Sequence, residues 1–115
     1  MYDIKTLNKI AACGTDLFDK AKYNVADSPE NPVAVMVRSA SMHEMEFGND
    51  LLAIARAGAG VNNIPVDRCA EQGIVVFNTP GANANAVKEL VLAGLFLSSR
   101  KITAAIEWAK TLKDE

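Results

Sequence analysis

Two arginines at the ends of apolar runs are the residues of this sequence best suited to bind an anion. Arg38 follows the run Val33–Val37, and Arg56 follows the run Leu51–Ala55. A guanidinium group can donate two parallel hydrogen bonds to a carboxylate or a phosphate, so the pair predicts a small anionic ligand. The alternative is that both side chains are solvated or paired with acids of the chain. The candidate acids are Glu44, Glu46 and Asp67.

A glycine-rich turn, Ala57-Gly58-Ala59-Gly60, comes directly after Arg56. Glycine permits backbone conformations in which successive N–H groups point at one spot, so this turn is either an anion pocket or simply a tight connection. It begins like the dinucleotide fingerprint Gly-x-Gly-x-x-Gly, but Asn63 stands at the third glycine position. The acidic residue required after the next strand is also missing, because that segment is Phe77-Asn78-Thr79. The turn is therefore not predicted to bind a dinucleotide.

Composition and the other reactive residues argue against several functions. The 115 residues suffice for one domain, and a formal net charge of −2 offers no surface for nucleic acid. No apolar stretch approaches the 18 or so residues of a membrane span. His43 is the single histidine, and Cys13 and Cys69 show no metal-binding spacing. We expect no metal site, and two reduced thiols in a cytoplasmic protein.

Short apolar runs alternate with helical segments through the first two thirds of the chain. The predicted strands are 4–7, 23–25, 33–37, 51–55 and 74–77. The predicted helices are 15–20, a short one within 42–47, and 65–72, the last ended by Gly73. This alternation predicts an α/β fold with a parallel, flavodoxin-like sheet and helices on both faces. Arg38 and Arg56 then lie near the carboxyl ends of strands, where ligands of such sheets bind.

A single long helix is predicted from Asn83 to Lys110, with Asn83 or Asn85 as its cap. It contains no proline, and residues 90–97 are apolar around the whole helix. A helix of this length projects beyond a small domain, so a second copy or another segment must cover it. We accordingly divide the chain into a domain at 1–82 and a connecting helix at 83–115.

Three ordered motifs resemble the D-isomer-specific 2-hydroxyacid dehydrogenases. They are Val35–Ala40, Ala55–Ile64 and Val76–Asn83, within a similarity that spans residues 33–100. Within the family, the chain looks most like the amino-terminal part of the bacterial members that oxidise 3-phosphoglycerate on the way to serine. The resemblance implies an NAD-dependent enzyme whose cofactor domain and catalytic residues come after the long helix. It therefore implies that these residues form an inactive part of the enzyme.

The resemblance also assigns roles to individual residues. Arg38 and Ser39 match the first substrate loop, and the segment Arg56–Gly60 matches the second, whose N–H groups hold the substrate carboxylate. Ala59 stands where many members have a Thr or Ser that contacts the cofactor, so only its backbone can make that contact. Asn83 matches a position near the substrate and the nicotinamide. The long helix, residues 83–110, matches the segment that crosses to the NAD domain and to the dimer interface.

A stand-alone flavodoxin-like binding or interaction module, which assembles through its long helix, is the alternative to an enzyme. Such a module predicts a stable oligomer with affinity for a ligand. The choice between NAD and NADP, and the identity of the 2-hydroxy acid, are implied by the resemblance alone.

Overall fold

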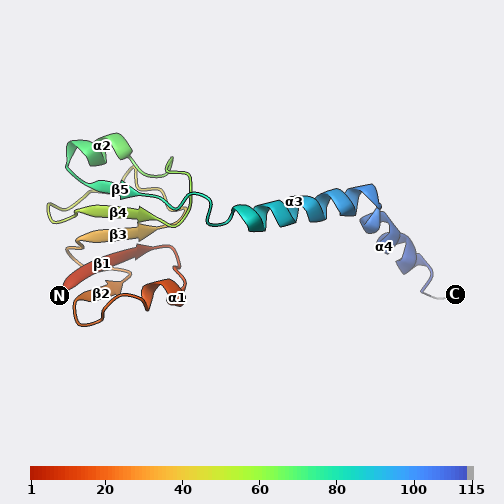
Figure 1. Cartoon of the computed structure of the whole chain (residues 1–115), viewed down its shortest axis with the longest axis horizontal. Helices are drawn as coiled ribbons and strands as arrows, with labels where there is room; N and C mark the ends of the chain where they lie inside the picture. The colour runs from red at the N-terminus through yellow and green to blue at the C-terminus, as the bar shows by residue number, and fades with distance from the viewer. Residues whose placement is uncertain (114–115) are drawn as a thin grey trace. The chain divides into compact units, whose positions relative to one another are not determined.

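The computed structural model describes residues 1–113 of the chain. These residues divide into two compact units, the first ending at Pro80 and the second beginning at Gly81. The first unit holds all the strands and the second unit holds two helices (Figure 1). None of the described helices is both long and apolar enough to cross a membrane.

The first unit is built on a parallel sheet of five strands in the order β2-β1-β3-β4-β5 (Figure 1). This is the strand order of flavodoxin-like folds, in which the order of the strands reverses between β1 and β3. The α/β class and the flavodoxin-like sheet predicted from the sequence are confirmed. The strands are β1 (Tyr2–Leu7), β2 (Tyr23–Ala26), β3 (Ala34–Val37), β4 (Ala53–Arg56) and β5 (Val75–Phe77).

One face of the sheet carries the hydrophobic core. Val35, Val37 and Ile54 point to this face and are almost fully buried. Helix α2 (Val66–Glu71) and the segment between β3 and β4 cover it, contributing Cys69 among others. As predicted, α2 follows Pro65 and ends at Gly73, which has the positive φ of 72° that glycine adopts without strain.

The opposite face is covered only in part. Helix α1 (Ala12–Thr15) lies over it and lines a groove with Met36. Farther along the sheet, on β5, the side chains of Val75 and Phe77 on this face remain exposed. Helices therefore lie on both faces, as predicted, but the β5 end of this face has no helix within the first unit.

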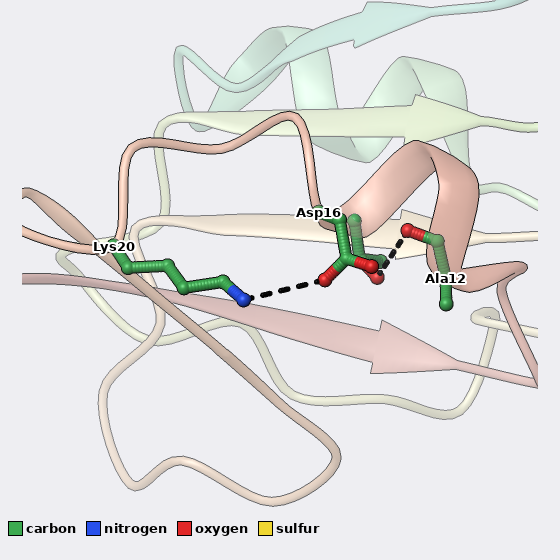
Figure 2. Close-up of polar contacts among 4 residues, drawn as sticks. Ala12, Asp16 and Lys20 are labelled. Carbon is green, nitrogen blue, oxygen red and sulfur yellow. Dashed lines mark hydrogen bonds and ion pairs between the residues drawn. The ribbon is translucent and has the colours of Figure 1, made fainter.

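The helix predicted over residues 15–20 is wrong. Helix α1 is a single turn, Ala12–Thr15, closed by a hydrogen bond from the Asp16 N–H to the Ala12 carbonyl at 2.8 Å. Figure 2 shows this turn with the side chains of Asp16 and Lys20 beside it. Lys20 then pairs with Asp16 at 3.4 Å. Beyond α1 the backbone continues as turns: the Leu17 and Phe18 N–H groups bond to carbonyls three residues earlier, and Asp19 accepts the Ala21 N–H with its side chain.

The short helix predicted within residues 42–47 is also absent. The Met42 and Met45 carbonyls accept hydrogen bonds from Arg68 Nη2, at 3.1 and 2.8 Å. Arg68 also lies over the Phe47 ring, 4.6 Å from its centroid. A side chain from α2 thus fixes this segment as an irregular loop, which no local pattern could reveal.

The second unit contains two helices, α3 (Ala84–Ser99) and α4 (Ile102–Thr111), so the prediction of one continuous helix is wrong. The break falls at Lys101, whose φ of 50° is left-handed. Ser98 and Ser99 direct their hydroxyls to carbonyls three residues earlier, which weakens the last turn of α3.

The predicted cap of α3 is wrong as well. Asn83 precedes the helix but its side chain caps no N–H group, and Asn85 bonds to Glu89 instead. No residue of α3 is buried within the described chain. Its large exposed apolar side chains are Val87, Leu90, Val91, Leu92, Leu95, Phe96 and Leu97.

Candidate anion-binding site

The loop that follows β4 presents a row of unused backbone donors. The Ala57 N–H bonds to the Val37 carbonyl at 2.8 Å, and the Gly58 N–H bonds to the Arg56 carbonyl at 2.9 Å. From Ala59 to Asn63, the N–H groups find no acceptor in the part of the chain that the structure describes. Backbone donors are normally paired with protein or solvent, so this exposed row is available to an anion.

Arg56 places its positive charge against the same loop. Its guanidinium lies over Gly58, with Nη1 only 1.5 Å from the point that a Cβ on Gly58 would occupy. The Arg56 Nε is buried and has no acceptor. Neither Arg56 nor Arg38 forms an ion pair with an acid among residues 1–113, so their pairing with chain acids, left open by the sequence, is not observed.

The segment after β5 holds this loop in place. The Thr79 N–H bonds to the Gly58 carbonyl at 3.0 Å, and Asn78 Nδ2 bonds to the Ala59 carbonyl at 2.9 Å. The Thr79 hydroxyl also lies 3.3 Å from the Arg56 carbonyl. Both supports were missed from the sequence, although their position after the neighbouring strand was the signal that could have identified them.

The loop that follows β3 is held by two asparagines that the sequence did not single out. Asn8 Oδ1 accepts the N–H groups of Arg38, Ser39 and Ala40, at 3.2, 3.0 and 2.9 Å. On the other side, Asn63 Nδ2 donates to the Arg38 and Ala40 carbonyls, at 3.2 and 2.8 Å. The backbone donors of this loop are therefore occupied, and only its side chains are free to meet a ligand.

The two arginines lie toward different faces of the sheet. Arg56 pairs in register with buried Val37, and the alternation of side chains turns Arg38 to the opposite face. There, Arg38 Nη1 donates a hydrogen bond to the Lys9 carbonyl at 3.4 Å. The Arg38 side chain and Met36 line an apolar groove of about 520 Å³ on this face. A ligand that contacts both guanidinium groups must therefore reach across the carboxyl edge of the sheet.

The remaining predicted site residues are distributed over both units. Ser39, Ala57, Ala59 and Gly60 are exposed in the two loops. His43 donates from Nε2 to the Asn62 carbonyl at 2.8 Å and so supports the second loop. Asn83 belongs to the second unit, and its place near the substrate and cofactor stays a prediction.

The glycine turn does not fit the pyrophosphate of a dinucleotide. In that site a helix begins at the turn, whereas α2 begins at Val66, well after Gly60. Asn63, at the third glycine position, is engaged with the Arg38 loop. The described residues thus contain donors for a small anion and no dinucleotide cradle at this turn.

Comparison with known proteins gives the family. The catalytic-domain model of the D-isomer specific 2-hydroxyacid dehydrogenases matches residues 10–112. The chain therefore belongs to this family of oxidoreductases.

Individual relatives are similar over part of their length. A hydroxypyruvate reductase of Thermotoga maritima is 45% identical over 80 residues, which are 67% of this chain and 26% of the relative. A D-3-phosphoglycerate dehydrogenase of Synechocystis sp. is 40% identical over 85 residues, covering 71% of this chain and 15% of the relative. The crystal structure of NAD⁺-bound 3-phosphoglycerate dehydrogenase from Entamoeba histolytica superimposes with a TM-score of 0.70 at 28% identity, over 84% of this chain and 38% of that one.

Proposed function

We propose that these 115 residues form the substrate-binding part of an NAD-dependent D-3-phosphoglycerate dehydrogenase that acts in serine biosynthesis in the cytoplasm. The curated relatives extend well beyond the matched region, since the match covers 26% of one and 15% of another. The nicotinamide domain and the residues that transfer protons and hydride are assigned to the rest of the protein. The chain alone is then inactive.

The observation that carries this proposal is the row of unused N–H groups beside the Arg56 guanidinium. The substrate carboxylate accepts the N–H groups of Ala59 and Gly60, and Arg56 supplies the compensating charge. Arg38 and Ser39 then meet the phosphate from the neighbouring loop. Fixing the acid at two points orients its hydroxyl-bearing carbon, and such orientation contributes several kcal/mol to catalysis.

NAD is assigned to the protein outside these residues because the glycine turn does not fit it. When bound, the cofactor accepts the hydride from the substrate. The contacts of Ala59 and Asn83 with NAD are part of the proposal. Hydride transfer itself is assigned to no side chain of this chain.

A second candidate substrate is hydroxypyruvate or D-glycerate, which lack the phosphate. The 45% identity to the Thermotoga maritima hydroxypyruvate reductase favours this candidate. 3-Phosphoglycerate and D-glycerate share the carboxylate and the 2-hydroxyl and differ only at the phosphate, so Arg38 discriminates between them. If Arg38 binds the phosphate, loss of Arg38 weakens the binding of 3-phosphoglycerate and leaves the affinity for D-glycerate unchanged.

Titration calorimetry of the chain with 3-phosphoglycerate and with D-glycerate tests the proposal. We expect the chain to bind 3-phosphoglycerate more tightly than D-glycerate. Arg38→Ala and Arg56→Ala each weaken the binding of 3-phosphoglycerate, whereas only Arg56→Ala weakens the binding of D-glycerate. Arg100→Ala, in the second unit, is the matched control. Equal affinity for both ligands favours the hydroxypyruvate reductase assignment, and hydride transfer by the purified chain contradicts its inactivity.

The proposal also assigns a partner to α3 and α4. A second copy of the chain covers the exposed apolar side chains of these helices, which gives a homo-oligomer. The alternative function, a stand-alone binding module, predicts the same oligomer without an enzyme. To distinguish the two functions, the separately produced cofactor domain of a related dehydrogenase is added to the chain. Turnover of the mixture supports the enzyme, and its absence supports the stand-alone module.

A further inference from the structure

We propose that Asn8 is a positioning residue for the first substrate loop, fixing Arg38 and Ser39 through their backbone; this inference rests on the proposed function. Asn8 itself contacts no ligand in this proposal. It acts through one atom, Oδ1, which accepts three consecutive N–H groups of the loop.

The position of Asn8 in the fold explains why it can act in this way. Asn8 comes directly after β1, and β1 pairs with β3 along Ile4–Leu7, so the ends of the two strands lie side by side. The order of the strands in the sheet reverses between β1 and β3, and the crevice at the carboxyl ends of two such strands is where ligands bind. The Asn8 side chain thus enters the crevice from the strand next to the loop that it holds.

The three N–H groups that meet at Asn8 form the kind of backbone concavity that usually binds an anion. Successive N–H groups directed at one point attract a carboxylate or phosphate oxygen. Here the amide oxygen of Asn8 occupies that point at 2.9 to 3.2 Å. The loop is therefore ordered before any ligand binds, and the ligand meets the side chains of Arg38 and Ser39 instead of their backbone.

The backbone of Asn8 shows that the residue type matters. Its φ is 70°, a left-handed conformation that asparagine tolerates far better than most residues. Asparagine thus supplies both the turn after β1 and the oxygen for the loop. Glycine supplies only the turn, because it adopts this φ without strain and has no acceptor. Aspartate keeps the oxygen and tolerates the same conformation.

The Arg38 loop is held from the other side by Asn63, which belongs to the second loop. Asn63 Nδ2 donates to the carbonyls of Arg38 and Ala40, while Asn8 takes the N–H groups. The loop is thus fixed by one neighbour through its donors and by the other through its acceptors. Releasing the donors alone leaves the loop attached but free to turn, which disorders Arg38 without unfolding the sheet.

Amide hydrogen exchange of the whole chain, followed by NMR, is the first arm of the test. We expect Asn8→Gly to speed exchange of the Ser39 and Ala40 amides about fivefold or more, as befits the loss of one hydrogen bond each. Asn8→Asp keeps their protection, and Asn31→Gly, in the exposed loop before β3, leaves it unchanged. Native protection in Asn8→Gly overturns the proposal.

A double-mutant cycle on 3-phosphoglycerate affinity is the second arm. We expect Asn8→Gly to weaken binding severalfold in the native chain and to have no further effect in Arg38→Ala, because Asn8 acts through the Arg38 loop. An equal effect in both backgrounds marks a merely structural residue and overturns the proposal. If the native chain binds no 3-phosphoglycerate, the proposed function fails, and amide exchange with its rescue by aspartate still decides the role of Asn8.

Discussion

The guanidinium of Arg56 occupies the space that a side chain on Gly58 would need. Arg56 Nη1 and Cζ lie 1.5 and 2.7 Å from the position of a Cβ on Gly58. The glycine therefore allows the positive charge to rest on the loop whose N–H groups are free. Because Gly58 has no side chain, the charge of Arg56 and the free N–H groups of the loop lie in one site.

Gly58→Ala is expected to displace Arg56 and to weaken anion binding by about tenfold, in line with the loss of one charged hydrogen bond. The guanidinium can swing into solvent, and the backbone φ of 159° at Gly58 adds a local strain that urea unfolding of the variant measures separately. Calorimetric titration with 3-phosphoglycerate measures the effect. Gly60→Ala is the matched control in the same loop, since its Cβ meets only Asn62 Oδ1 at an ordinary 3.5 Å. Equal losses in the two variants would contradict the role of Arg56.

Arg68 is expected to contribute more to stability than an exposed arginine does. Arg68→Met removes two hydrogen bonds to backbone carbonyls and the contact with Phe47, at an expected cost of about 1–3 kcal/mol. Urea unfolding measures this difference. Arg68→Lys keeps the charge and a nitrogen with several donors but loses the planar group that lies over Phe47, so full stability in that variant would show that the guanidinium plane is not needed.

The strands themselves follow from local pattern, and so were predictable. Continuous apolar runs such as Val33–Val37 are typical of central parallel strands, and the structure confirms a strand there at Ala34–Val37. Helix α2 was predictable for the same reason, because Pro65 and Gly73 mark its ends. These features depend on residues close together in the sequence.

The errors arise where a distant side chain or a local hydroxyl decides the backbone. Arg68 binds the carbonyls of residues 42 and 45 from α2, which removes the helix expected there. Ser98 and Ser99 end α3 before Lys101, although no glycine or proline marks the break. In both cases, hydrogen bonds override helix propensity.

The loops of the candidate site were predictable from the sequence, but the arrangement of their side chains in space was not. Arg56 and the glycines were identified from their place after a strand. The opposite orientation of Arg38 depends on strand alternation at the edge, and the clamps from Asn8 and Asn63 depend on which strands are neighbours. Such contacts become visible only once the order β2-β1-β3-β4-β5 is known.

Association of the chain is expected to depend on the apolar side chains of α3. Leu90 and Phe96 are 74% and 65% exposed, so Leu90→Glu or Phe96→Glu should shift an oligomer toward monomer in sedimentation experiments. Phe77→Glu, on the exposed face of β5, is the control for nonspecific apolar contact. An oligomer that persists in both α3 variants and dissociates in Phe77→Glu would place the interface on the sheet instead.

Cys69 is expected to make the folded chain less stable in alkaline solution. Its side chain is fully buried, and burial raises the pKa of the thiol above its ordinary value of 9.0, with Arg68 opposing part of the rise. Above that value the unfolded chain releases the thiol proton while the folded chain keeps it, so the free energy of unfolding falls as pH rises.

Urea unfolding at about pH 7.5 and about pH 10 measures this effect through the difference between the two conditions. Cys69→Ala lowers stability at both pH values, because it leaves a small cavity in the core, but it should reduce the loss between them. Cys13→Ala is the control, since Cys13 is exposed and its replacement should leave that loss unchanged. A pH-dependent loss as large in Cys69→Ala as in the native chain would show that other groups cause it, and that the buried thiol does not resist ionisation.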